Sequence, residues 1–194
     1  MKDKVSILQE AVGTGEVDKI NNQFNSELQQ QIDGTLPIGH IYKLGNPGVN
    51  LLSAGLPDFP IELNAGRLAR KASINYRNNH PFDLSAIKDL PNAINDPIAV
   101  FNSTKPNDNS KMILTELQHS GNNFVVVIKT YLKSPGRNIE SSVNTISSLY
   151  PKDKFKELLN WLKSDRMVAW KNEEKALRFI QVQSTNLIAD GIKA

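Results

Sequence analysis

Hydrophobic positions divide the chain into a helical start, a strand-rich middle and a helical end. In residues 5–33, Ile20, Phe24 and Leu28 recur at the spacing of one helix face. The glycines of Gly13-Thr14-Gly15 are expected to break this segment, because glycine weakens a helix.

The middle of the chain is typical of antiparallel strands. Short apolar runs, of which Phe124 to Ile128 is the strongest, lie between clusters of turn residues. Connections this short can join only antiparallel neighbours, because parallel strands need long crossovers. The expected strands of this meander are residues 97–103, 111–118, 123–132 and 142–150. Two shorter runs, 38–44 and 61–63, also suit strands.

Short helices flank these strands. One is expected at residues 64–74, and Asp83 is the N-cap candidate of another, which Pro91 is expected to break into two pieces. The C-terminal part predicts a helix at 153–162, an extended piece at 167–170 and a last helix capped by Asn172. The order predicts an α+β fold: N-terminal helices, an antiparallel sheet of about four strands and flanking C-terminal helices, with the helices on one face of the sheet.

Charge is distributed unevenly along the 194 residues, which carry a net charge of +3. Residues 1–35 hold three basic and six acidic side chains and so carry −3, which leaves +6 for residues 36–194. We therefore expect an acidic helical extension over 1–35 and a basic α+β domain over 36–194. The basic domain favours a polyanionic partner, although an ordinary solvated surface fits the same charge equally well.

Several classes of chemistry are excluded by what the sequence lacks. It has no cysteine, so a disulfide scaffold, cysteine-ligated zinc and a cysteine nucleophile are excluded. It has no phosphate-binding glycine loop, no nucleophile elbow, and only scattered histidines (His40, His80 and His119). We expect no metal and no cofactor. No apolar stretch suits a signal sequence or a membrane span, so the expected location is the cytoplasm, with no membrane partner.

The remaining side chains suit the cleavage of RNA by its own 2′-OH. That reaction needs a general base, an acid and cations that stabilise the phosphorane. Glu116 lies within an expected strand and His80 at a helix entrance, so both are candidates for acid–base catalysis. Lys129 could face Glu116 across the sheet if the strand register allows. The plainer alternatives are a solvent-facing strand carboxylate and a surface or capping histidine.

Five short motifs, followed by Trp161 near the end, occur in an order that resembles a known family. The motifs are His80-Pro81-Phe82-Asp83-Leu84, the run from Leu90 to Ile94, the run from Asp96 to Ser103, the run from Ile113 to Leu117 and the run from Asn144 to Asp153. Together they resemble the C-terminal domain of MuF-like phage proteins and domains of bacterial polyvalent proteins. Those are grouped with the barnase, EndoU, colicin and RelE-like ribonucleases. The resemblance spans roughly residues 36–185.

This resemblance implies a curved sheet and a metal-independent endoribonuclease of a phage or mobile element. RNA is the implied partner, with tRNA as one candidate substrate, together with an immunity or other protein partner. The implied catalytic residues are His80, Glu116, Ser148 and Tyr150. The implied substrate-binding residues are Ser103, Asn144 and Lys152, to which Lys129 is added from its strand position.

The expected roles follow from the side chains. Glu116 or His80 is the base, Lys152 holds the phosphate, and Ser103 and Ser148 donate hydrogen bonds to phosphate oxygens. Related sequences often carry arginine where this chain has Ser147. The alternative from another class is a catalytically inactive module of a mobile-element protein that binds nucleic acid or protein. A third is an antitoxin-like or scaffold protein bound through its acidic extension.

Overall fold

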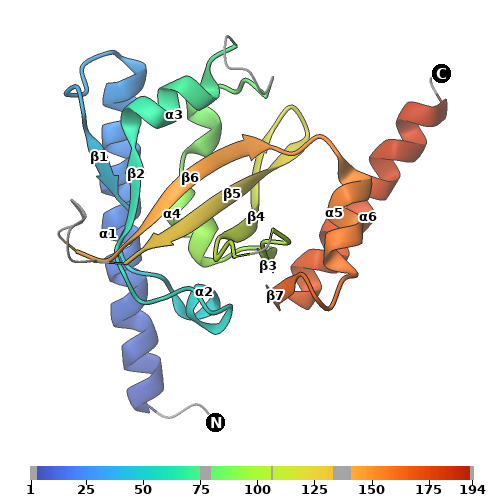
Figure 1. The fold of residues 1–194 in the computed structure, drawn as a ribbon, viewed down its shortest axis with the longest axis horizontal. Coiled ribbons are helices and arrows are strands. Elements are labelled where there is room, and N and C mark those ends of the chain that lie inside the picture. The colour runs from blue at the N-terminus through green and yellow to red at the C-terminus, as the bar shows by residue number, and fades with distance from the viewer. Residues whose placement is uncertain (1–3, 75–79, 106, 133–140, 193–194) are drawn as a thin grey trace.

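One seven-stranded mixed sheet forms the centre of the computed structural model, which describes residues 4–74, 80–105, 107–132 and 141–192 (Figure 1). The strands are β1 (Ile41–Lys43), β2 (Ile61–Asn64), β3 (Ala99–Asn102), β4 (Lys111–His119), β5 (Asn122–Tyr131), β6 (Val143–Pro151) and β7 (Val168–Lys171). The helices are α1 (Lys4–Ile32), α2 (Val49–Ser53), α3 (Ala65–Ala72), the 3₁₀ helix η1 (Leu84–Ile87), α4 (Leu90–Asn95), α5 (Phe155–Leu162) and α6 (Glu173–Ile192).

The sheet contains the predicted meander and extends it on both sides. Strands β3, β4, β5 and β6 pair in turn and antiparallel, which confirms that part of the prediction. The full order is β1-β2-β6-β5-β4-β3-β7, so the predicted sheet of four strands is coarser than the real one. Strand β2 pairs with β6 in parallel, through Ile61 opposite Asn144. This pairing joins segments that are far apart in the sequence, and no local sequence pattern predicts it.

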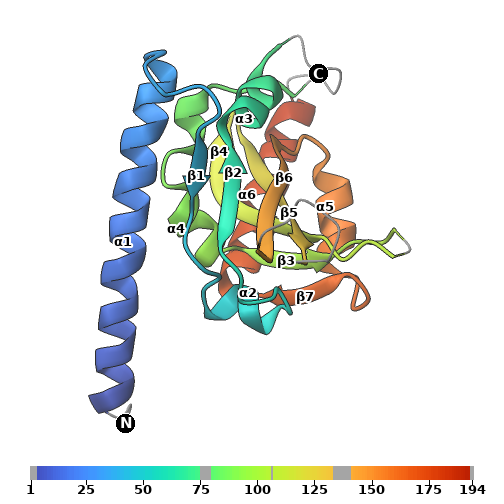
Figure 2. The ribbon, with the colours of Figure 1, turned by 60° about the vertical axis from the view of Figure 1, so that its left-hand side comes forward.

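Both faces of the sheet are covered by helices, so the expectation of helices on one face is wrong. Val126 belongs to a core with α1, α3 and α4, whereas its neighbour Val125 belongs to a second core with α5 and α6. Figure 2 shows α1 and α4 on one side of the sheet and α5 and α6 on the other. A strand that is buried on both faces reads as a continuous apolar run, which explains Phe124 to Ile128.

Helix α1 is continuous, so the break expected at Gly13-Thr14-Gly15 is wrong. Each glycine costs an interior helix about 1 kcal/mol, which the remainder of a long helix can offset. Phe24 and Leu28 are almost completely buried in the core that α1 shares with α3 and α4. The division into an extension over 1–35 and a domain over 36–194 stays a prediction, although the end of α1 packs with the domain.

A hydrogen-bonded junction fixes α1 against the start of α4. One oxygen of Asp89 accepts hydrogen bonds from the side-chain amides of Asn21 and Asn25, each at 2.7 Å. Asn25 in turn accepts from the backbone N–H of Asp89, which has a left-handed φ of 65°. The hydrogen bonds from Asn25 and Asn21 lower the pKa of the Asp89 carboxyl. The expected helix is indeed in two pieces, η1 and α4, but the break lies at Lys88 and Asp89, and Pro91 is in the first turn of α4.

Replacement of Asp89 by asparagine should therefore weaken the protein in a pH-dependent way. A carboxyl whose pKa is lowered by folding stabilises the fold above its unfolded pKa of about 3.9, and that stability is lost as the pH falls through the folded pKa. Asp89→Asn should be less stable than the wild type at pH 7, by less than about 1 kcal/mol because solvent screens an exposed carboxylate. In urea unfolding the gap should narrow as the pH falls below the unfolded pKa and through the lower pKa of the folded carboxyl. A gap that stays constant with pH would contradict this assignment.

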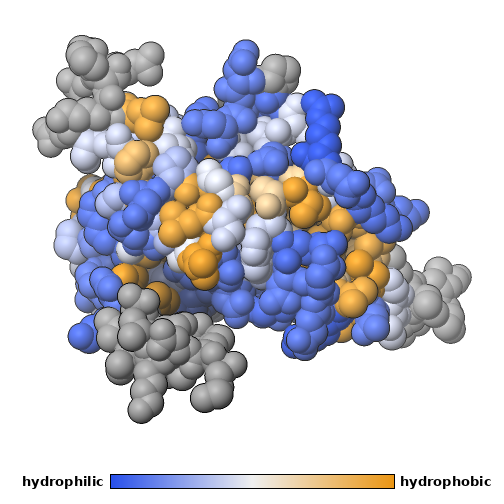
Figure 3. Space-filling model, turned by 90° about the horizontal axis from the view of Figure 1, so that it is seen from below, coloured by the Kyte–Doolittle hydropathy of each residue, from blue (hydrophilic) through white to orange (hydrophobic). Residues whose placement is uncertain are grey.

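The surface is mixed in character. Figure 3 views the molecule from below relative to Figure 1, and on this face hydrophobic residues form separate patches among hydrophilic ones. Exposed apolar side chains in the described residues include Val49 and Leu52 of α2, and single positions of this kind are ordinary on globular proteins. Within the described ranges, no helix combines the length and apolar character that crossing a bilayer demands.

Candidate functional site

The end of strand β6 brings together side chains from distant parts of the chain. His80 comes from the segment before η1 and Tyr150 from β6, and their rings stack with centroids 5.7 Å apart and planes inclined by 29°. On the other side of the imidazole, Nδ1 of His80 lies 3.9 Å from Oδ2 of Asp153. This distance suits an ion pair with the protonated ring and is too long for a hydrogen bond. The side chain of His80 is one-third exposed, so solutes can reach it.

A cation is held beside these rings. Lys152 follows β6, and its Nζ donates to Oε2 of Glu157 on α5 at 2.7 Å. The same ammonium lies 5.1 Å from the ring centroid of Trp161, within the range of a cation–π contact. The Trp161 ring packs edge-on against Phe101, which fixes its orientation. We call His80, Tyr150, Lys152, Asp153, Glu157 and Trp161 the β6-end cluster.

Tyr150 is a partly buried member of the β6-end cluster. Burial and, to a smaller degree, the charge of Glu157 raise the pKa of its hydroxyl, which therefore keeps its proton at neutral pH. Ser148 lies two residues earlier on β6, opposite Val127, and alternation along a strand places it on the same face as Tyr150. The structure thus brings His80, Tyr150 and Lys152 together, with Ser148 next to them along the strand.

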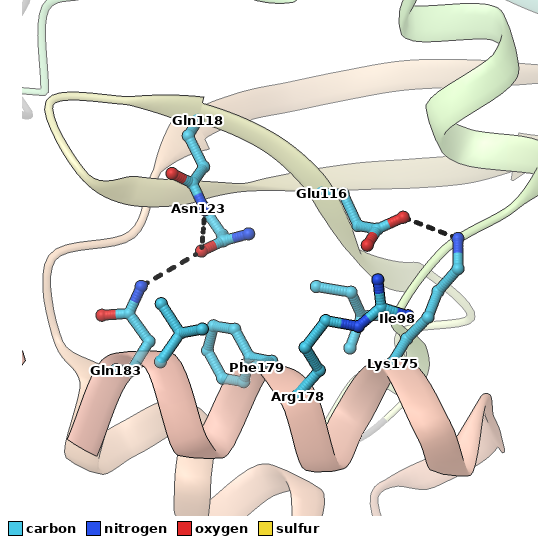
Figure 4. A pocket seen from close by; sticks show the side chains of 9 residues that line it. Ile98, Glu116, Gln118, Asn123, Lys175, Arg178, Phe179 and Gln183 are labelled. Carbon is cyan, nitrogen blue, oxygen red and sulfur yellow. Dashed lines mark hydrogen bonds and ion pairs between the residues drawn. The ribbon is translucent and has the colours of Figure 1, made fainter. Parts of the chain in front are cut away.

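Glu116 lies in a different place, a pocket of about 140 Å³ between β4 and α6 (Figure 4). Its carboxylate accepts a hydrogen bond from Nζ of Lys175 at 2.7 Å, and the same ammonium donates to Asp96. Partial burial works against the charge of Lys175, but the hydrogen bonds to Asp96 and Glu116 outweigh it and raise the pKa of the ammonium. Amide side chains line the other end of this pocket, where Gln118 and Gln183 both point toward Asn123.

The strand register separates Glu116 from the β6-end cluster. Tyr150 lies opposite Val125 on β5, and Val125 lies opposite Leu114 on β4. Leu114 and Tyr150 are thus two strand spacings apart, or about 10 Å. Glu116 is two residues beyond Leu114 and turns toward α6, where Lys175 neutralises it. None of His80, Ser148 and Tyr150 is among the described residues that line its pocket.

Lys129 and Ser103 lie toward the opposite end of the sheet. Lys129 is paired with Thr145, four residues along β5 from the position opposite Tyr150, which is about 13 Å of strand. The register therefore does not bring Lys129 to Glu116. Ser103 donates to Oδ2 of Asp108 at 3.0 Å in the β3–β4 connection, and Lys129 interacts electrostatically with the same carboxylate.

Asn144 is fully buried and holds β6 to the segment before β2. Its amide nitrogen donates to the carbonyl oxygens of Pro57 and Phe59, both at 2.8 Å, and its oxygen accepts from the hydroxyl of Thr130 at 2.7 Å. All of its hydrogen-bonding groups face protein. In this structure the side chain of Asn144 is therefore structural and does not reach a ligand.

The sequence reasoning passed over some of the residues that the structure places at β6. Asp153 ends one of the family motifs and Glu157 lies in the helix expected at 153–162, but neither had an assigned role, and their partners His80 and Lys152 emerge only from the fold. Arg67 and Arg70, on a helix whose basic residues carried no assigned role, line a pocket with Ser147 of β6. Within the described residues, no three histidine or carboxylate side chains converge in the manner of metal ligands.

A family comparison covers the part of the chain that contains the β6-end cluster. The profile of the phage MuF C-terminal domain matches residues 71–178, which is more than half of the chain. The chain belongs to the phage MuF C-terminal domain family. No curated protein and no solved structure matches it. The matched part of this MuF C-terminal domain runs from Lys71 in α3 to Arg178 in α6, so it includes all six residues of the β6-end cluster.

Proposed function

We propose that this MuF C-terminal domain is a metal-independent endoribonuclease whose reaction takes place at the β6-end cluster. The observation that supports this most is the stacking of His80 on Tyr150, whose hydroxyl also interacts electrostatically with Glu157, the ion-pair partner of Lys152. A base, a protonated hydroxyl and a cation are the groups that RNA transesterification needs, and here two segments of the chain, the one before η1 and the end of β6, supply them.

In this proposal His80 acts as the base. Its neutral imidazole takes the proton of the 2′-OH, the 2′ oxygen attacks phosphorus, and the bond from phosphorus to the 5′ oxygen breaks. The products are a 2′,3′-cyclic phosphate and a 5′-OH. Asp153 stabilises the imidazolium that forms, since its carboxylate is within ion-pair distance of Nδ1.

Tyr150 and Lys152 act on the other side of the reaction. The protonated hydroxyl of Tyr150 supplies the proton that the leaving 5′ oxygen takes up. Lys152 stabilises the negative charge that grows on the phosphate oxygens, and Ser148 donates a hydrogen bond to one of them. Glu157 and Trp161 fix the position of the Lys152 ammonium before substrate arrives, so little reorganisation is needed.

The test is incubation of the purified protein with total tRNA and with a mixed-sequence RNA in excess EDTA. We expect cleavage to fragments with 2′,3′-cyclic phosphate ends, since no step uses a metal. A 2′-O-methylated RNA of the same sequence should stay intact because it lacks the attacking hydroxyl. RNA that is bound but remains intact would contradict the proposal and favour the inactive binding module.

Glu116 remains the competing candidate for the base, and one pair of variants separates the two assignments. His80→Ala should abolish cleavage if His80 is the base. Glu116→Gln should do so if the carboxylate is the base, even though Lys175 neutralises it in the structure. Loss of activity in Glu116→Gln but not in His80→Ala would move the chemistry to the pocket of Figure 4.

A further inference from the structure

A second basic site lies beside β6, on helix α3. Arg67, Arg70 and Lys71 line a surface pocket of about 220 Å³ together with Ser147 of β6. The three cations occupy positions i, i+3 and i+4 of one helix, which places their side chains side by side. Leu68, between them in sequence, is fully buried and anchors the opposite face of α3 in the core.

The helix presents these cations in a fixed position. Asn64 caps α3 by accepting a hydrogen bond from the backbone N–H of Arg67 at 2.8 Å. Ser147 forms the floor of the pocket on β6, and its hydroxyl donates to the carbonyl oxygen of Val127 at 3.1 Å. The donors that face a ligand are therefore those of the basic side chains.

The charge of this pocket is unbalanced. Its described lining contains no carboxylate, and neither Arg67 nor Arg70 forms an ion pair with a described residue. Like charges at these spacings destabilise a helix, and a cation in its first turn, as Arg67 is, also opposes the helix dipole. By contrast, Lys175 in the pocket of Figure 4 is paired with two carboxylates. Among the described residues, Arg67 and Arg70 thus lack the counter-charge that Lys175 has.

We propose that the α3 pocket binds a phosphate group of the RNA strand, one or two nucleotides away from the phosphate cleaved at the β6-end cluster. Two guanidinium groups suit a phosphate because each can donate two parallel hydrogen bonds to its oxygens. Ser147 and Tyr150 are three residues apart on β6, or about 10 Å along the strand, and β2 pairs with β6 only at Asn144 and Thr145. One extended RNA strand that follows the open edge of β6 beyond Thr145 can therefore reach both sites. This inference rests on the proposed function and adds how the substrate strand is oriented.

The test measures binding separately from cleavage. A fluorescent, fully 2′-O-methylated 12-nucleotide RNA cannot be cleaved by transesterification, and its affinity is followed by fluorescence anisotropy across a range of salt concentrations. In Arg67→Gln/Arg70→Gln we expect the Kd to rise about tenfold and the slope of log K against log salt to fall by about 0.7, the value for one lost phosphate contact on a single strand. Glutamine keeps much of the length of each side chain, and both arginines are at least partly exposed, so the fold should persist.

The matched control is Lys19→Gln/Lys88→Gln, which removes the same two charges from exposed positions on α1 and after η1. Its Kd should stay within about twofold of the wild type, a small change expected from net charge alone. Equal weakening in both double variants would overturn the inference. If the arginine variant misfolds, Arg67→Lys/Arg70→Lys serves instead, since it keeps the charge but loses the bidentate geometry. A Kd unchanged in that variant would likewise count against the pocket.

Failure here can be told from failure of the proposed function. If the wild type cleaves unmodified RNA but Arg67→Gln/Arg70→Gln does not change the Kd, the nuclease proposal is supported and the phosphate site is contradicted. If Arg67→Gln/Arg70→Gln weakens binding but the wild type leaves unmodified RNA intact, the phosphate site is supported and the nuclease proposal is contradicted.

Discussion

Replacement of His80 by alanine should lower the rate of RNA cleavage by about 10²–10⁴-fold, the usual contribution of a general base. The loss should appear mainly in kcat, because the imidazole acts on the 2′-OH in the transition state and contributes little to binding the strand. The assay is single-turnover cleavage of a labelled RNA in EDTA. The anisotropy Kd for the 2′-O-methylated RNA should change by less than about threefold, because the phosphate contacts remain.

The matched control is His119→Ala, which removes a partly buried histidine at the end of β4, outside the β6-end cluster. It should cleave RNA at nearly the wild-type rate. Thermal unfolding of both variants shows whether the fold persists. A folded His80→Ala variant that cleaves as fast as His119→Ala would exclude His80 as the base.

The second large effect is on stability, where Asn144→Ala should lower the free energy of unfolding by about 3 kcal/mol. The substitution leaves the carbonyl oxygens of Pro57 and Phe59 and the hydroxyl of Thr130 without their partner. Buried polar groups that lose a partner cost about 1–3 kcal/mol each, and the neighbouring structure relaxes enough to keep the sum below that of three independent losses. Urea unfolding measures the difference.

The control for this prediction is the neighbouring Thr145→Ala. Thr145 is only partly buried and is opposite Lys129, so its replacement should cost less than about 1 kcal/mol. Asn144 is also among the residues that the family resemblance assigns to substrate binding. An Asn144→Ala variant with unchanged stability and weakened RNA binding would restore that role and contradict the structural one.

The sequence predicted the local elements of this fold better than their partners. Alternation and turn residues predicted the meander from β3 to β6, and Asn172 caps α6 as expected, by accepting from the backbone N–H of Lys175. The parallel pairing of β2 with β6 was beyond reach because it depends on tertiary contacts between distant segments. The apolar run in β5 is typical of a strand that is covered on both faces, but it does not show which helices pack on each face.

The candidate site was also predictable only in part, because its residues meet through tertiary contacts between distant segments. Residue types and motif order singled out His80, Tyr150 and Lys152, which the structure places together. The same reasoning included Asn144 because a polar residue in a strand pattern gives no sign of whether it faces solvent or a buried carbonyl. The α3 pocket went unassigned, since basic residues at helical spacing are usually a solvated face, and only the nearby Ser147 on β6 turns them into a site.

The parallel pairing of β2 with β6 has a consequence for how this chain acquires its structure during synthesis. Ile61 in β2 cannot pair with β6 until Asn144 has been synthesised. In the same way, β3 cannot pair on its outer side until β7 has been synthesised. Contacts between residues so far apart in sequence slow folding, because a long loop must close before they form. A ribosome-bound chain that ends before β6 would leave β2 paired with β1 alone and would leave α3 without the strand it packs against. The nascent chain is therefore expected to depend on chaperones until β6 has emerged.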